Sequence, residues 1–304
     1  MPELPEVETV VRGLRSLIGK KIKSLVINKP KLVSVGPKVL SPKRIHDQSQ
    51  VRQFTKVLQE RKILGVQRRA KLIQIKLDRD WWLLVHLKMT GQMLIQQKNQ
   101  KRLLAKLTNT PKAPLELLPS KHTHIIVNFT DSTKLYYNDV RVFGTWRAVK
   151  NQDLKKVKDL QDFGPEPLSK EFTIEVFKKN LNKRPNLKIK QALIEQSLIA
   201  GVGNIYADEA LFWAKIRPTK SVKRIKTKEW LCLYKALQKV LIKAIARHGS
   251  SVGDFIRTNG KTGNYGNFHM VYGRKGLPCK ICKKSIKRIA IGGRSSHFCA
   301  FCQK

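Results

Sequence analysis

Four cysteines near the C-terminus have the spacing of a metal site. They form two pairs in the pattern C-x2-C-x16-C-x2-C: Cys279, Cys282, Cys299 and Cys302. Two short chelating turns supply four thiolates, the ligand set of tetrahedral structural zinc. Two disulfides are the alternative, and an open catalytic zinc is disfavoured because all four ligands are protein sulfur. A module this small folds poorly alone, so the metal is expected to contribute its folding energy.

The first residues carry a different chemistry. Three carboxylates, Glu3, Glu6 and Glu8, precede the first basic side chain, Arg12. Pro2 is small enough to permit removal of the initiator methionine, which would leave a free secondary amine. An α-amino group titrates near about 7.7–8.0, so a neutral fraction can attack an electrophilic carbon and form an iminium, with Glu3 beside it to move protons. Glu6 and Glu8 also fit a simpler role as charges on the first turn of a helix.

The charge of the chain indicates a polyanionic partner. Its 304 residues include 62 Lys and Arg against 21 Asp and Glu, which gives a formal net charge of +41. Such a field attracts nucleic acid first and an anionic membrane surface second, although part of the excess fits a solvated coat of lysines. No apolar run is long enough to span a membrane, and no secretory signal is visible. The scarcity of cysteine outside the two pairs indicates a reducing compartment.

Periodicity predicts the scaffold that must position these residues. Apolar spacing predicts a helix over 5–18, and short β-rich runs from 22 to about 146 predict an antiparallel sandwich or barrel-like domain. A polar stretch over 96–121 is expected to be a loop or insertion. Residues 171–248 have a helical pattern in which Cys232 is expected to be a buried apolar residue. The predicted organisation is a β-sandwich domain (1–150), a linker (151–170), a helical domain (171–265) and a zinc finger (266–304).

Eight motifs follow one another along nearly the whole chain: MPELPEVETVVRGL, RRAKLIQI, HLKMTG, NDVRVFGTW, GPEPL, IAGVGNIYADEALF, YGRKGLPCKIC and CAFCQK. In this combination the sequence closely resembles the formamidopyrimidine-DNA glycosylases, bacterial repair enzymes for oxidised purines such as 8-oxoguanine. The resemblance implies an α+β fold of two domains: an N-terminal antiparallel β-sandwich with a leading helix, and a C-terminal helix-two-turn-helix domain with a β-hairpin zinc finger.

The resemblance implies chemical roles for four residues. Pro2 matches the nucleophile that attacks C1′ of the damaged nucleotide, after which the base leaves, an iminium links protein and sugar, and β- and δ-elimination cut both sides. Glu3 matches the acid that protonates the opening sugar ring. Lys71, in RRAKLIQI, matches a lysine that donates a proton in β-elimination. Arg294, in GGRSSHF, matches the finger arginine that clamps phosphate and is linked to δ-elimination.

The resemblance also implies DNA contacts. Met89, Arg141 and Phe143 match the side chains that fill the gap left by the extruded base, because chemistry on a base requires flipping it out and wedges partly replace its stacking. Asn204 would open the second helix of the helix-two-turn-helix, with backbone amides towards phosphate, and it also fits simple helix capping. Lys190 matches a lysine of the family that binds phosphate. His122 matches a further DNA contact of the family.

Several positions depart from the family pattern. Glycine is usual where Lys88 stands, and serine is usual where Thr90 stands. Pro-Arg-Arg is usual where this chain has V-R-V, so that Val142 replaces a second arginine. These departures concern how the partner base is read. The segment 248–268 stands where the family carries the loop that closes over 8-oxoguanine, and loops of this kind vary.

Two other functions are alternatives. Endonuclease VIII, a sister glycosylase for oxidised pyrimidines, shares Pro2, Glu3 and the zinc module but typically has glycine where Leu4 stands. A non-enzymatic zinc-ribbon protein would keep Asn204 and the finger and lose the N-terminal residues. The expected partner is damaged double-stranded DNA, with one structural Zn2+, no organic cofactor, no membrane and a monomeric state. The expected location is the bacterial cytoplasm, with nucleoid association when the protein is bound to DNA.

Overall fold

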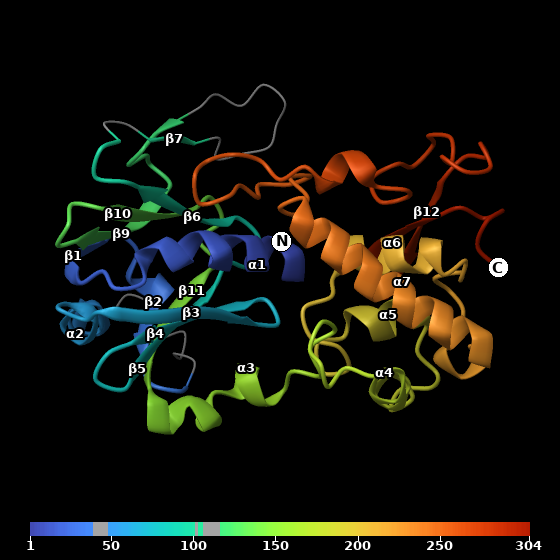
Figure 1. Cartoon of the computed structure of the whole chain (residues 1–304), viewed down its shortest axis with the longest axis horizontal. Coiled ribbons are helices and arrows are strands. Elements are labelled where there is room, and N and C mark those ends of the chain that lie inside the picture. The colour runs from blue at the N-terminus through green and yellow to red at the C-terminus, as the bar shows by residue number, and fades with distance from the viewer. Residues whose placement is uncertain (39–47, 101–102, 106–115) are drawn as a thin grey trace. The chain divides into compact units, whose positions relative to one another are not determined.

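The chain folds into two compact units. The computed structural model describes residues 1–38, 48–100, 103–105 and 116–304 (Figure 1). The first unit comprises residues 1–2, 6–161 and 248–264, and the second comprises residues 3–5, 162–247 and 265–304. The segment 248–264 therefore belongs with the N-terminal unit. The domain boundaries at residues 150, 170 and 265 stay predictions.

The strands of the first unit are β1 (Ile22–Ile27), β2 (Val33–Val35), β3 (Ile63–Arg69), β4 (Leu72–Leu77), β5 (Trp81–His86), β6 (Gly91–Gln96), β7 (Leu104–Ala105), β8 (Glu116–Leu117), β9 (Thr123–Phe129), β10 (Lys134–Asp139) and β11 (Thr145–Lys150). One sheet has the order β1-β9-β10-β6, and its neighbours are antiparallel. The other has the order β2-β11-β5-β4-β3, in which β2 is parallel to β11 and the remaining neighbours are antiparallel. The short strands β7 and β8 pair with each other.

Helix α1 (Leu4–Leu14) packs against both sheets. Its apolar residues recur at helical spacing from Val7 to Leu14 and share one buried core with residues of the two sheets. Figure 1 shows α1 running between the sheets. A 3-10 turn (Arg15–Leu17) extends the helix as far as Gly19, whose φ of 88° ends it. The predicted leading helix and the sandwich are confirmed.

Helix α2 (Gln48–Leu58) was not predicted from the sequence. It is polar for most of its length, but Phe54 and Leu58 are fully buried in the same core. The first unit ends with the short helix α3 (Lys158–Gln161). Residues 101–102 and 106–115 of the loop predicted over 96–121 lie outside the described residues, and β7 and β8 fall within the remainder.

Helices build the second unit: α4 (Ile174–Leu181), α5 (Ile189–Ile194), α6 (Asn204–Trp213) and α7 (Thr227–Ala246). The helical pattern predicted for this region is confirmed. All four helices contribute to one apolar core, for which α7 supplies a stripe from Trp230 to Ala244. Helix α6 is buried nearly all round, so its polar residues must find partners inside the protein.

A β-hairpin follows in the second unit. It consists of β12 (Lys287–Ile291) and β13 (Arg294–Phe298), in which Ile291 pairs with Arg294. The two residues between them, Gly292 and Gly293, have φ of 54° and 72°. A tight two-residue hairpin turn of this kind requires positive φ, which glycine adopts without strain. The predicted finger hairpin is confirmed.

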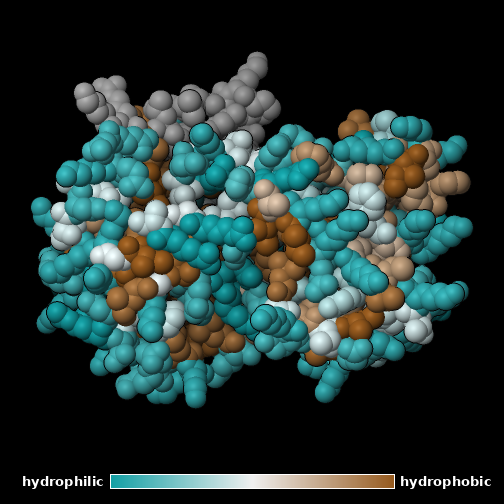
Figure 2. Space-filling model, in the orientation of Figure 1, coloured by the Kyte–Doolittle hydropathy of each residue, from teal (hydrophilic) through white to brown (hydrophobic). Residues whose placement is uncertain are grey.

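The surface matches the composition. Figure 2 shows hydrophilic residues over most of the visible face, with hydrophobic residues gathered in separate patches. Among the helices that the structure describes, none has both the length and the apolar character needed to cross a membrane.

Candidate active site and nucleic-acid interface

Glu3 is held by the first turn of α6. Its Oε1 accepts a hydrogen bond from the amide of Ile205 at 2.9 Å, and its Oε2 accepts one from the amide of Tyr206 at 3.3 Å. The N-terminal amides of a helix form a natural anion site, and here the chain's own carboxylate occupies two of them. Gly203 provides the space, because a Cβ there would overlap the Glu3 carboxyl group. Pro2, which is also buried, directly precedes Glu3 in the chain.

Glu6 anchors the segment that matches the lesion-covering loop. Its Oε1 accepts a hydrogen bond from the amide of Ser250 at 2.7 Å. Strand β6 holds the same segment, because the amide of Ile95 donates to the carbonyl of Thr258 at 2.8 Å, and the side chain of Gln92 donates to another of its carbonyls at 2.6 Å. The loop is therefore tied to the first unit at several points. The role of Glu6 as a mere first-turn charge does not account for its Ser250 contact.

Lys71 lies in the tight turn between β3 and β4 and is only 6% exposed. Ala70, the other turn residue, has φ of 52°. Arg68 braces the turn, since its guanidinium donates to the carbonyl of Ala70 at 2.9 Å and to Glu8 of α1 at 3.3 Å. A buried lysine in a braced turn is not an ordinary solvated charge, and the chemical role implied for Lys71 stays a prediction.

The three predicted wedge residues lie in two exposed loops of the first unit. Met89 follows β5 and is 37% exposed, and Phe143 precedes β11 and is 51% exposed. The guanidinium of Arg141 lies 4.7 Å from the centre of the Phe143 ring, so the two form one cation–π unit. His122 is half-buried in the turn before β9, and its carbonyl accepts a hydrogen bond from the amide of Asp139 at 3.1 Å.

Asp139 joins these loops and was not singled out from the sequence. Its carboxylate is fully buried and accepts from the amides of Phe143 at 2.9 Å and Gly144 at 2.8 Å, while Thr90 donates to its other oxygen. The hydroxyl of Thr90 in turn accepts from the amide of Arg141 at 3.0 Å. One buried carboxylate thus sets the backbone of both wedge loops. The signal in the sequence was a single acid at the end of the β-rich run YYNDV. A carboxylate that is buried in such a run must accept hydrogen bonds.

Replacing Asp139 with asparagine is expected to lower the free energy of unfolding by about 2–4 kcal/mol. Asparagine has only one acceptor oxygen, so either the amides of Phe143 and Gly144 or the hydroxyl of Thr90 would lose an acceptor. Urea unfolding measures the change, and cleavage of damaged DNA should slow with it. Asp131→Asn is the matched control, since that carboxylate is 43% exposed in its pair with Lys20 and should cost no more than about 1 kcal/mol. Equal losses in both variants would contradict the role of Asp139.

Two of the departures from the family pattern stand at strained backbone positions. Lys88 has φ of 52° and Val142 has φ of 53°, a region that is costly for residues with a Cβ and most costly for β-branched ones. His86 supports the first turn: its Nδ1 accepts from the amide of Lys88 at 2.9 Å. Burial, together with the charge of Lys88, lowers the pKa of His86 to about 3, so the ring is neutral and its Nδ1 can accept a hydrogen bond.

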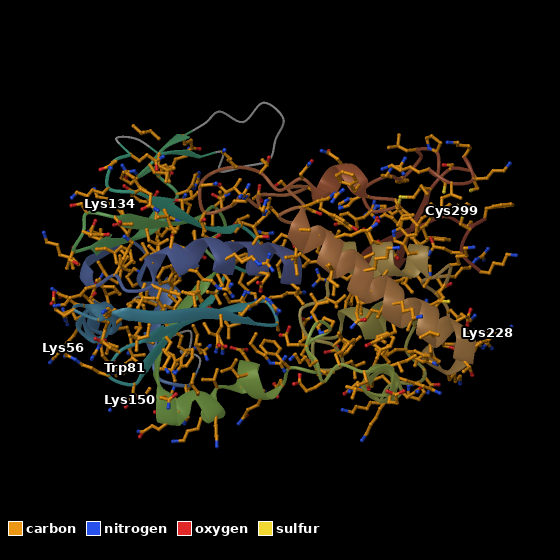
Figure 3. All side chains as sticks on the ribbon, in the orientation of Figure 1. Lys56, Trp81, Lys134, Lys150, Lys228 and Cys299 are labelled. Atoms are coloured by element: carbon orange, nitrogen blue, oxygen red, sulfur yellow. The ribbon has the colours of Figure 1, made fainter. Side chains whose placement is uncertain are left out.

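Lys88→Gly is expected to stabilise the protein by about 0.5–1 kcal/mol, because glycine adopts this φ without strain. Urea unfolding measures the gain. Lys134→Gly, at the exposed first residue of β10, is the matched control (Figure 3) and should cost about 0.5–1 kcal/mol. A loss of stability in Lys88→Gly comparable to the control would show that the lysine is not strained.

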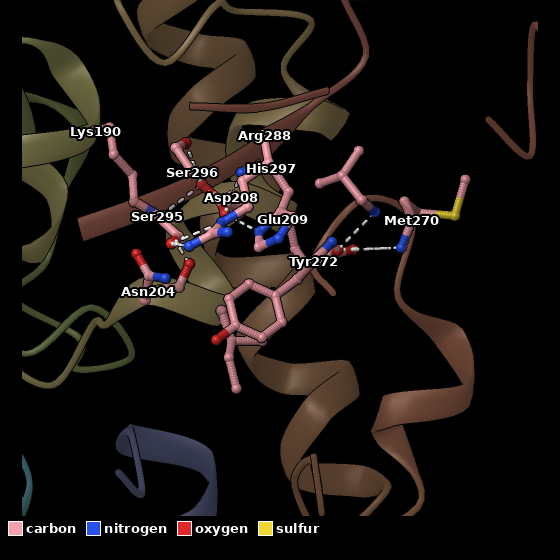
Figure 4. A network of polar contacts seen from close by, with 12 residues as sticks. Lys190, Asn204, Asp208, Glu209, Met270, Tyr272, Arg288, Ser295, Ser296 and His297 are labelled. Carbon is pink, nitrogen blue, oxygen red and sulfur yellow. Dashed lines mark hydrogen bonds and ion pairs between the residues drawn. The ribbon is translucent and has the colours of Figure 1, made fainter. Parts of the chain in front are cut away.

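The phosphate contact implied for Lys190 stays a prediction. In the structure its side chain is fully buried. Its Nζ donates to Asp208 at 2.5 Å and to the carbonyl of Asn204 at 2.8 Å (Figure 4). Burial lowers the pKa of Lys190, and the charge of Asp208 partly opposes this effect. The ammonium therefore positions the start of α6 through Asn204 and Asp208.

Two adjacent acids of α6 join that helix to the C-terminal segment. Asp208 also accepts from the hydroxyl of Ser296 at 2.7 Å and the amide of His297 at 2.8 Å on β13. Glu209, fully buried, accepts from successive backbone amides, including that of Tyr272 at 2.9 Å (Figure 4). The phenol of Tyr272 is hydrogen-bonded to the side chain of Asn204, the first residue of α6. The acids in ADEALF therefore have structural partners, which the sequence alone did not assign.

The four predicted cysteines come together in the finger. Their Sγ atoms all lie within 4.8 Å of one another, with Cys282 and Cys299 at 3.4 Å and Cys279 and Cys302 at 3.9 Å. A tetrahedron with zinc–sulfur bonds of about 2.3 Å needs sulfur separations of roughly 3.8 Å, so the set fits one structural zinc. Figure 3 labels Cys299 in this cluster. Arg294, exposed at the start of β13, lies at the turn of the hairpin that follows the first pair.

Loss of zinc is expected to unfold the finger. Cys299→Ser should reduce bound zinc from about one per chain to near zero and make residues 276–304 sensitive to protease, since structural zinc supplies much of the folding energy of such modules. Zinc released on thiol modification, measured with a colorimetric chelator, provides the count. Cys232→Ser is the control and should retain the metal, because Cys232 is exposed on α7 rather than buried as predicted. Full zinc content in Cys299→Ser would contradict the assignment.

The chain matches known proteins along its whole length. Residues 1–146 match the formamidopyrimidine-DNA glycosylase N-terminal domain, and residues 163–255 match the helix-two-turn-helix domain of the same enzymes. Residues 276–304 match a zinc finger found in these enzymes and in IleRS. The formamidopyrimidine-DNA glycosylase of Pelotomaculum thermopropionicum is 39% identical over 100% of this chain and 99% of its own, and that of Listeria monocytogenes is 36% identical over all of both chains.

Solved structures of formamidopyrimidine-DNA glycosylases are also similar to this chain. The Lactococcus lactis enzyme bound to DNA containing N7-benzyl-Fapy-dG is 34% identical, with a TM-score of 0.81 over all of both chains. The Thermus thermophilus protein is 33% identical, with a TM-score of 0.80 over 99% of this chain and 98% of its own. The matching domains, relatives and structures lead to one conclusion: this chain belongs to the formamidopyrimidine-DNA glycosylase family.

Proposed function

We propose that the chain is a bifunctional DNA glycosylase and abasic-site lyase of base excision repair, which removes oxidised purines such as 8-oxoguanine and formamidopyrimidines from duplex DNA. The amine of Pro2 attacks C1′, the bond from C1′ to the base breaks, and the base leaves. Glu3 donates a proton to the ring oxygen as the sugar opens to an iminium. Loss of a C2′ proton expels the 3′ phosphate in β-elimination, and δ-elimination then expels the 5′ phosphate.

The observation that carries this proposal is the setting of the N-terminus. The Glu3 carboxylate is buried and fixed by two amides of α6, one residue from the proposed nucleophile. Positioned groups of this kind are what proton transfer requires. Lys71 is the proposed proton donor in β-elimination, and Arg294 the proposed phosphate clamp. Zinc supplies the folding energy of the finger and takes no part in the bond changes.

The DNA contacts are also proposals. Met89 and Phe143 would enter the gap left by the flipped nucleotide, while Arg141 hydrogen-bonds the orphaned partner base. Their exposure in loops braced by Asp139 supports this role. Asn204 and His122 would contact phosphate or sugar, with Lys190 acting through Asn204. We further propose a monomer that works in the bacterial cytoplasm and associates with the nucleoid when bound to DNA.

Borohydride trapping on duplex DNA with 8-oxoguanine opposite cytosine tests the function. A covalent protein–DNA adduct and cleavage at the lesion are the expected results. A duplex with an oxidised pyrimidine serves as the competing substrate. Faster trapping on that duplex would favour the endonuclease VIII type of specificity, and binding without any adduct would favour a non-enzymatic DNA-binding protein.

A further inference from the structure

A concave surface on the second unit is not used by the proposed repair site. It has a volume of about 540 Å³ and runs along one side of α7, within the usual range for ligand pockets. Its apolar lining includes Trp213, Val240 and Phe268, of which Trp213 is 49% exposed and Phe268 is 44% exposed. We call this surface the α7 pocket. None of the residues assigned above to chemistry, DNA or zinc lines it.

Cations form a row along the α7 pocket. Lys235, Lys239 and Lys243 lie within α7, and Arg247 follows directly after it. Successive members are four residues apart, so they are spaced about 6 Å along the helix axis. The three lysines have no ion pair among the residues that the structure describes, and no Asp or Glu lines the pocket there. An apolar hollow with a regular, unneutralised positive edge is complementary to a ligand that carries both an apolar group and negative charges.

We propose that the α7 pocket binds an extended, acidic peptide segment of a partner protein, with one aromatic or aliphatic side chain seated in the hollow. In an extended peptide, side chains on one face repeat about every 6.6 Å, which matches the spacing of the cation row. Acidic residues at alternate positions would therefore meet successive cations. Residues between the acids point the opposite way in an extended peptide, so a peptide lying between the cation row and the hollow would turn an apolar residue towards the exposed ring of Trp213.

The lining favours a peptide over single-stranded nucleic acid. Arg247 lies over the ring of Phe268 at 3.9 Å, which covers a face on which a base would stack. No Asn, Gln, Ser or Thr lines the pocket in the described part of the chain, so its polar groups are mainly cations, which suit carboxylates better than the mixed donors and acceptors on the edge of a base. An aliphatic or aromatic side chain carries no such cost.

Cys232 makes the proposal measurable on the full-length protein. It lines the α7 pocket and is exposed, whereas the other four cysteines of the chain form the zinc set. The probe is a fluorescent synthetic peptide with aspartate at every second position and a central phenylalanine. Binding by fluorescence anisotropy should be accompanied by at least about fivefold slower alkylation of Cys232, read by mass spectrometry. Replacing the phenylalanine of the probe by serine should weaken binding about tenfold or more.

Charge-matched variants separate the pocket from the overall field. Lys239→Glu combined with Lys243→Glu should weaken the peptide about tenfold or more. Lys178→Glu combined with Lys179→Glu makes the same change in net charge on exposed residues of α4, a helix that does not line the pocket. This control should change binding by less than about twofold.

Three outcomes would overturn the proposal. Equal weakening of peptide binding in the two double variants would show that the interaction depends only on net charge. If the serine probe binds as tightly as the phenylalanine probe, the apolar hollow does not contribute to binding. Stronger protection of Cys232 by a single-stranded oligonucleotide would assign the pocket to nucleic acid. Both double variants should cleave damaged duplex DNA at similar rates, so a failure of this proposal is distinguishable from a failure of the repair function.

Discussion

Blocking the amine of Pro2 is expected to reduce cleavage of 8-oxoguanine DNA by at least roughly a thousandfold and to abolish the borohydride-trapped adduct. An uncleaved residue added before Pro2 converts the amine into an amide and leaves the other side chains of the chain unchanged. The loss should be equally large on a duplex that already contains an abasic site, because iminium formation needs the same nitrogen. Pro2→Gly, which replaces the secondary amine by a primary amine, should be impaired less than the extended chain.

Binding provides the control for this experiment. The extended chain should still bind a duplex with a stable abasic analogue within a few fold of the original affinity, because the residues proposed to contact DNA are unchanged. Met1 is 46% exposed, so its removal by the processing enzyme is sterically reasonable. Active protein that retains Met1, as measured by intact mass, would contradict the proposed nucleophile.

The sequence predicted those parts of the fold that depend on local periodicity. The leading helix, the β-rich first unit and the cysteine spacing could all be read from neighbouring residues, as the burial of Val7 to Leu14 illustrates. Helix α2 was missed because only a few apolar residues, Phe54 and Leu58 among them, mark its buried side within a polar segment. Cys232 was assigned wrongly, although its spacing from Lys235 and Lys239 places it on a lysine-bearing stripe of α7.

The contacts that organise the site could not be predicted in this way. Glu3 meets α6, Glu6 meets Ser250, and Asp139 spans two loops, each through hydrogen bonds between residues distant in the sequence. The tertiary fold decides which groups become the hydrogen-bond partners of these acids, so no local sequence pattern encodes them. A buried acid among apolar neighbours was the remaining signal, since such a group must be hydrogen-bonded. That signal indicates that partners exist but does not name them.

Gly203→Ala is expected to slow excision of 8-oxoguanine by roughly a hundredfold, because small displacements of a catalytic group have effects of that size. The backbone at Gly203 has φ of −135°, which alanine adopts without strain. The added methyl group would, however, overlap the Glu3 carboxyl group and push it from the amides of α6. Gly65→Ala, where the nearest atom outside the adjoining chain would be 3.9 Å from the new Cβ, is the matched control and should be nearly neutral.

A second substrate shows whether the effect acts through Glu3. An abasic sugar is already in equilibrium with its open aldehyde, so it does not need the proton that Glu3 gives to the ring oxygen. Glu3→Gln should therefore lose excision of 8-oxoguanine while keeping much of its cleavage at abasic sites, and Gly203→Ala should reproduce this split. If Gly203→Ala instead loses both activities equally, the methyl group disturbs more than Glu3. If it loses neither, the placement of Glu3 by α6 does not limit the reaction.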